Sequence, residues 1–147
     1  MSNKTNLASC FFLAALLFTT GCATKPPVAS GPPAQVPSIK VTLDCGACQV
    51  RPTVPALIMQ GYSEAAKNAG AVILPAREAT VSIQDYSARS DAGRFLVGAF
   101  AGKDEIKVLV SNEGKQFSVE DYYRNAWQGI ESLALKIGED VFTKLKP

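Results

Sequence analysis

Histidine is absent from the sequence of 147 residues. Because histidine is the commonest general base and metal ligand, its absence excludes histidine-dependent nucleophile systems and histidine-ligated zinc sites. A basic cluster is also missing, since 15 Lys and Arg are scattered among 13 Asp and Glu. Nucleic-acid binding needs a basic patch, so we expect no nucleic-acid partner. We also expect no cofactor, no metal site and no enzymatic activity.

The first 21 residues are expected to be a secretory signal peptide. Lys4 precedes an apolar run from Leu7 to Phe18, which is shorter than the roughly 20 residues of a membrane-spanning helix. A positive start, a short apolar run and a small-residue end are typical of a signal. The end, TTGC, resembles the bacterial lipoprotein lipobox, with Thr19 in place of the usual leucine. The resemblance implies that Cys22 is acylated, and Ala23 after it implies an outer-membrane lipoprotein facing the periplasm.

Residues 22–38 are expected to be the lipidated cysteine and a tether. Five prolines and many small residues fall in this stretch, a composition that cannot build a packed core. Two or more acyl chains on one cysteine anchor a protein stably to a membrane. The remaining segment, 39–147, is long enough for a single periplasmic domain with one core.

Hydrophobic patterning in 39–147 predicts an α+β domain. Period-two alternation and short apolar runs predict five strands, at 38–44, 71–74, 79–86 and in two arms of a hairpin over 105–119 that turns at 112–114. Helical spacing predicts two helices, over 54–70 and 118–146, the second starting at a capping-box-like Ser118 and Asp121. The predicted order is β-α-β-β-β-β-α, a single sheet of about four to five strands with helices on one face.

Cys45 and Cys48 follow the first predicted strand, in the stretch DCGACQV. A metal clip needs four ligands, which the sequence does not supply. CGAC resembles the CGPC of thioredoxin-like enzymes, but Asp44 stands where that family has an aromatic residue, and Pro52 and Pro55 interrupt the start of the next helix. Disulfides persist outside the cytoplasm. We therefore favour a local structural disulfide, with a periplasmic thiol-disulfide oxidoreductase as the alternative.

The stretch GAFAGKD, Gly98 to Asp104, lacks the glycine spacing and the Ser or Thr of a phosphate-binding loop, so we expect no nucleotide. The wider segment, Arg94 to Gln116, resembles a widespread family of bacterial lipoproteins of unknown function. In that family an Arg…Gly-x-x-Ala-Gly-Lys turn precedes a β-hairpin and a terminal helix. The resemblance implies a lipid-anchored envelope domain and assigns no chemistry.

The apolar side chains of this turn either fill the core or form an exposed patch for a partner. The candidate partner-binding residues are Arg89, Arg94, Phe95, Phe100 and Lys103, with both arginines at the rim. We predict an accessory module that docks onto secretion, polysaccharide or cell-wall machinery. The alternatives are the oxidoreductase above and a plasmid- or phage-borne exclusion lipoprotein.

Overall fold

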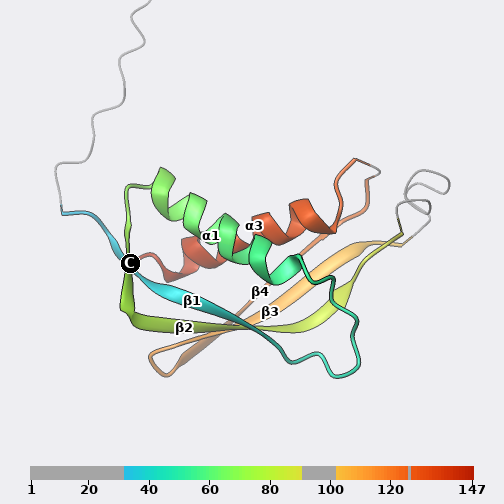
Figure 1. The fold of residues 1–147 in the computed structure, drawn as a ribbon, viewed down its shortest axis with the longest axis horizontal. Helices are drawn as coiled ribbons and strands as arrows, with labels where there is room; N and C mark the ends of the chain where they lie inside the picture. Colours follow the sequence, from blue (N-terminus) through green and yellow to red (C-terminus); the bar gives the residue numbers. More distant parts are fainter. Residues whose placement is uncertain (1–31, 91–101, 126) are drawn as a thin grey trace, which may run out of the picture. The chain divides into compact units, whose positions relative to one another are not determined.

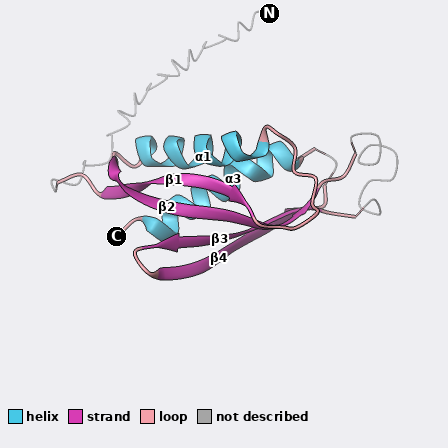
Figure 2. Ribbon diagram, turned by 60° about the horizontal axis from the view of Figure 1, so that its bottom comes forward, coloured by secondary structure: helices cyan, strands magenta, loops and turns pink. Residues whose placement is uncertain are grey.

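The computed structural model describes residues 32–90, 102–125 and 127–147. These residues form one four-stranded sheet with two helices on one face (Figures 1 and 2), which confirms the predicted α+β class. In chain order the elements are β1 (Gln35–Leu43), α1 (Val54–Asn68), β2 (Val72–Ser87), β3 (Asp104–Asn112), β4 (Lys115–Tyr123) and α3 (Ile130–Leu145). The first strand begins at Gln35, so residues 35–38 are part of the sheet rather than of the predicted tether.

The strand order in the sheet is β1-β2-β3-β4. Strands β1 and β2 are parallel because α1 carries the chain back between them, whereas β2–β3 and β3–β4 are antiparallel. The two strands predicted at 71–74 and 79–86 are one strand, β2. Its pairing to β1 shifts between Leu74 and Glu78, and Pro75 lies in that irregularity, where its missing N–H costs no ladder hydrogen bond.

The helix predicted over 118–146 is shorter than expected, because its first part is β4. Strand β4 pairs with β3 residue by residue, around a tight turn in which Glu113 and Gly114 have φ of 50° and 79°. The apparent capping box of Ser118 and Asp121 therefore lies in a strand. Phe117, Val119 and Tyr123 face the core at even spacing, as in a strand. Val119 and Tyr123 alone also have helical spacing, and pairing with β3 decides between the two.

Helices α1 and α3 touch through glycine. A Cβ on Gly61 would lie 2.0 Å from the Leu135 carbonyl oxygen, and one on Gly138 would lie 2.2 Å from the Ile58 carbonyl oxygen. Gly138 therefore permits a close contact between the two helices. The core between helices and sheet is built mainly from aliphatic side chains of every element.

Tyr62 connects α1 to β1 through a hydrogen bond. Its hydroxyl donates a 2.6 Å hydrogen bond to the Pro37 carbonyl oxygen, and its ring packs edge-on against Phe142 at 5.9 Å. Burial raises the pKa of Tyr62 to about 12, because the charged phenolate is disfavoured away from water. The phenol therefore keeps its proton, and its hydrogen bond, through the physiological range.

Candidate functional site

Three connections meet at one end of the sheet. The pairing of Ser87 with Glu105 and of Asp104 with Tyr123 places the end of β2, the start of β3 and the end of β4 at this end. The connection from β1 to α1 lies there too (Figure 1). We call this end, formed by residues 44–53, 88–90, 102–103 and 122–129 without residue 126, the loop end.

A buried ion pair organises the loop end. Arg89 is 6% exposed and Asp104 is fully buried. The Arg89 guanidinium donates to Asp104 Oδ2 from Nε at 3.2 Å and from Nη2 at 2.9 Å, and the Arg89 backbone N–H donates to Oδ1 at 2.7 Å. Charge-assisted pairs of this kind hold a defined geometry. The pair thereby joins the end of β2 to the start of β3.

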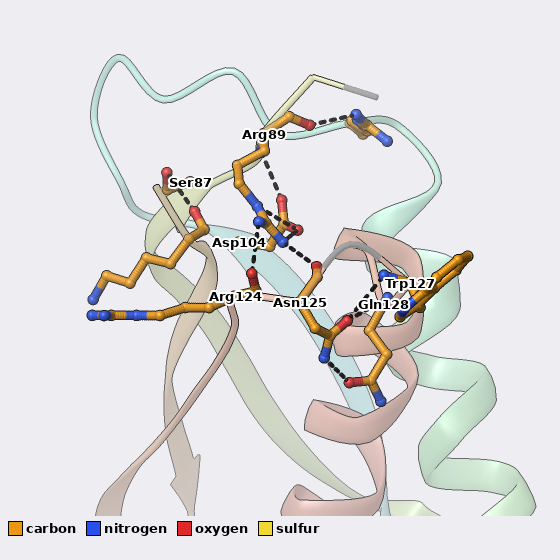
Figure 3. A network of polar contacts seen from close by, with 9 residues as sticks. Ser87, Arg89, Asp104, Arg124, Asn125, Trp127 and Gln128 are labelled. Carbon is orange, nitrogen blue, oxygen red and sulfur yellow. Dashed lines mark hydrogen bonds and ion pairs between the residues drawn. The ribbon is translucent and has the colours of Figure 1, made fainter. Parts of the chain in front are cut away.

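Arg89 also binds the connection between β4 and α3. Its Nη1 donates to the Arg124 carbonyl oxygen at 3.1 Å and its Nη2 to the Asn125 carbonyl oxygen at 2.9 Å (Figure 3). Asn125 Oδ1 then accepts from the backbone N–H groups of Trp127 at 3.2 Å and Gln128 at 2.7 Å. This asparagine turn fixes the backbone immediately before α3.

Arg51 ties the β1–α1 connection into the same network. Its guanidinium pairs with Glu131 in the first turn of α3 and donates to the Arg89 carbonyl oxygen at 3.4 Å. Its backbone N–H donates to the Tyr86 hydroxyl at 3.4 Å. Burial, together with the nearby charges of Glu131 and Asp104, raises the pKa of Tyr86, so the phenol stays protonated. The chain segments of the loop end are thus held together by two arginines.

Aromatic and cationic side chains project from this network. Trp127 is 88% exposed, and Tyr122, at the end of β4, is 49% exposed. The Lys103 ammonium and the Arg124 guanidinium each lie 5.4 Å from the centre of the Tyr122 ring, within cation–π range. Figure 3 shows Arg124 and Trp127 pointing to opposite sides of the Arg89–Asp104 pair. The loop end therefore presents an aromatic side chain on each side.

A polar groove of about 470 Å³ opens beside the pair. It is lined by Gln49, Arg51, Tyr86, Ser87, Ala88, Arg89 and Ser90. Both guanidinium groups in the lining already hold carboxylate and carbonyl partners, which leaves few donors for a bound anion. Among the residues described, no group of three potential metal ligands comes together.

Cys45 and Cys48 form a disulfide, with Cα atoms 5.6 Å apart. Gly46 between them has a φ of 62°, a left-handed conformation that glycine adopts at little cost. The Cys48 N–H donates to the Cys45 carbonyl oxygen at 3.3 Å, and the Asp44 N–H before the pair donates to the Ile83 carbonyl oxygen at 2.9 Å. The disulfide closes the turn that follows β1.

The predicted site residues have different outcomes. Arg89 was expected as an exposed rim contact, and the structure corrects this, because its side chain is buried against Asp104. Lys103 is partly exposed beside Tyr122 and pairs with Glu105 at 2.5 Å. Cys22, Arg94, Phe95 and Phe100 lie outside the described residues.

Sequence reasoning missed Asp104, Asn125 and Trp127. Two signals were available. Asp104 lies in phase with the alternating Ile106, Val108 and Val110, and Trp127 is the single tryptophan of the sequence, in the polar stretch RNAWQG. The helix predicted over 118–146 includes that stretch, so the sequence indicated no separate role for the tryptophan.

Neither a family model nor a curated protein sequence matches the chain. Among solved structures, the chain is similar to a dodecameric variant of PelC from Paraburkholderia phytofirmans, with 12% identity, over 80% of this chain and 94% of that chain, at a TM-score of 0.47. This likeness is too low to transfer any site. The described helices include none with the length and apolarity required to cross a membrane.

Proposed function

We propose that this protein is a lipid-anchored binding module of the bacterial outer membrane, whose periplasmic domain docks onto another protein of the cell envelope through its loop end. The N-terminal signal and lipobox resemblance support the location. The oxidoreductase alternative rests on Cys45 and Cys48, and the sequence around them departs from the thioredoxin-like pattern at Asp44, Pro52 and Pro55.

The exposure of Trp127 carries the proposal. A tryptophan that is 88% exposed leaves a large apolar ring in water. The backbone beneath it is fixed by Asn125, which is held in turn by the buried Arg89–Asp104 pair. Tryptophan, tyrosine and arginine are the residue types enriched at the energetic centres of protein interfaces, and the loop end displays one of each in Trp127, Tyr122 and Arg124.

Pre-organisation makes this arrangement suited to binding. A side chain on an ordered turn loses less conformational entropy when a partner covers it than one on a free chain. Arg124 makes no ion pair within residues 32–90, 102–125 and 127–147, and its guanidinium lies over Tyr122. It is therefore placed to meet a carboxylate of the partner.

In vivo photocrosslinking tests the proposal. A photoreactive phenylalanine analogue at position 127 should give a discrete crosslinked product in the envelope that mass spectrometry identifies. The same analogue at Met59, which is exposed on α1, is the matched control and should not give that product. Equal products from both positions, or none from position 127, would contradict docking through the loop end.

A further inference from the structure

The two free edges of the sheet differ. In β1, Pro37 lacks an N–H, the pairing shifts directly after it, and its carbonyl oxygen is already bound by Tyr62. Prolines and bulges are features that protect an edge from pairing with another strand. Strand β4, at the other edge (Figure 1), has neither proline nor register shift along its whole pairing with β3.

The hydrogen-bonding groups left open on β4 follow from its turn. A two-residue turn makes Asn112 and Lys115 a hydrogen-bonded pair, so the odd-numbered residues of β4 bond to β3. The backbone groups of the even-numbered residues point to the free edge. The Tyr122 N–H is taken by Asp121 Oδ1 at 2.8 Å. The open stretch therefore runs from Gln116 to Glu120.

Space exists beside this stretch. A cleft of about 240 Å³ lies between β4 and α3, lined by Ser118, Val119, Glu120, Asp140, Thr143 and Lys144. Glu120 pairs with Lys107 at 3.6 Å and Asp140 with Lys136 at 2.9 Å. Lys144 has no ion pair within the part of the chain that the structure describes, so its ammonium is available to a carboxylate on an added strand.

We propose that β4 pairs antiparallel with β4 of a second copy of this chain, in a register centred on Ser118, which joins two sheets into one. Lys115 then faces Asp121 of the second copy, whose Oδ2 also pairs with Lys136 of its own chain at 2.7 Å, and Phe117 faces Val119. Opposite charges and apolar pairs directly across two strands are stabilising. Gln116 faces Glu120, so like charges do not meet along the paired stretch.

Registers shifted toward the C-terminal end of β4 fit less well. A centre at Val119 places the Phe117 ring opposite Asp121, and a centre at Glu120 places this carboxylate opposite itself, which is unfavourable. In the register centred on Ser118, the N–H of Tyr122 would face Gly114 in the turn of the second copy, beyond the end of the paired stretch. The Tyr122 N–H already donates to Asp121 Oδ1, and this pairing does not require it.

Site-specific crosslinking tests this pairing independently of the partner proposed above. The full chain is produced in membranes of a Gram-negative bacterial host with Ser118→Cys and treated with a short bismaleimide. Position 118 faces itself in the second copy, so a covalent dimer is expected. Gln116→Cys is the matched control, because position 116 lies on the same face and edge of β4. It faces Glu120 of the second copy, so the two cysteines at position 116 would lie several residues apart along the strands.

We expect Ser118→Cys to give about tenfold more dimer than Gln116→Cys, measured against the unsubstituted chain. Lys115→Glu should reduce the Ser118→Cys dimer by more than half. Adding Asp121→Asn removes the like charge that the introduced glutamate would face but keeps an acceptor for the Tyr122 N–H, and it should restore the dimer. Lys40→Glu makes the same charge change on the edge strand β1 and should leave the yield unchanged. Equal yields from positions 116 and 118, or no dimer from Ser118→Cys above the unsubstituted chain, would overturn the proposal.

Discussion

Arg89 uses its backbone N–H and three side-chain nitrogens to bind one carboxylate and two carbonyl oxygens. The net free energy of such a buried pair is modest, because both charges lose their water. The pair instead positions the backbone. The Arg89 guanidinium holds the end of β2, the start of β3 and the turn before Trp127 in one arrangement.

Replacing Asp104 by alanine should lower the free energy of unfolding by about 3–5 kcal/mol, because the Arg89 charge would stay buried without its carboxylate. Urea unfolding of the two proteins measures the difference. Glu113→Ala is the control: it removes the exposed carboxylate that pairs with Arg77, and we expect a loss of at most about 1 kcal/mol. Similar losses for both variants would show that Arg89 does not depend on Asp104.

The role of these residues was beyond sequence reasoning for a physical reason. Arg89 was a candidate, and Asp104 continues the alternation of Ile106, Val108 and Val110 toward the core, but alternation does not say which cation a buried carboxylate pairs with. The carbonyls of Arg124 and Asn125 carry no side-chain signature. Only the antiparallel pairing of β2, β3 and β4 brings these groups together.

At the scale of helices and strands, the contact between α1 and α3 depends on two glycines, Gly61 and Gly138, because a Cβ at either position would collide with the backbone of the other helix. Gly138→Ala should lower the free energy of unfolding by about 2 kcal/mol, because overpacking costs more than the roughly 1 kcal/mol that alanine gains in helix propensity. The new Cβ would meet backbone atoms of Ile58 and Tyr62. Denaturant unfolding provides the measurement.

Ser63→Ala, on the exposed side of α1, is the control for this prediction. Surface substitutions of this kind change stability by about 0.5 kcal/mol or less. If Gly138→Ala were as stable as Ser63→Ala, the two helices would not be in the backbone contact described.

The disulfide after β1 closes a very short loop. Replacing both Cys45 and Cys48 by serine should therefore leave the domain folded and lower its free energy of unfolding by only about 1–2 kcal/mol. An insulin-reduction assay separates this structural role from thiol–disulfide exchange, which requires an accessible thiolate of low pKa. Turnover comparable to that of a thioredoxin, lost in Cys45→Ser, would favour the oxidoreductase instead.

The strands and helices were predictable where one periodicity dominated. Alternation in the segment 105–119 located the hairpin and its turn, and helical spacing located α1. The boundary between β4 and α3 was not predictable, because the spacing of Val119 and Tyr123 suits one face of a strand and one face of a helix alike. Whether β2 is one strand or two also depends on a partner, since β1 accommodates Pro75 by shifting its pairing.

At the scale of the whole molecule, the proposal requires a membrane anchor outside the folded domain. Cys22→Ser should abolish labelling with a palmitate analogue and move the protein out of the outer-membrane fraction, because acyl chains supply the attachment. Fractionation and metabolic labelling test this. Unchanged labelling and partitioning of the variant would rule out lipidation at Cys22.

The proposed docking through the loop end is tested most directly by affinity. Once photocrosslinking has identified the partner, its Kd for the lipidated chain can be compared with that for Trp127→Ala and Met59→Ala. Loss of a central interface residue costs 2 kcal/mol or more, so we predict that Trp127→Ala weakens binding by about 30-fold. Met59→Ala, which removes an exposed apolar side chain from α1, should leave the Kd within about twofold. Equal affinities for the Trp127 and Met59 variants would contradict docking through the loop end.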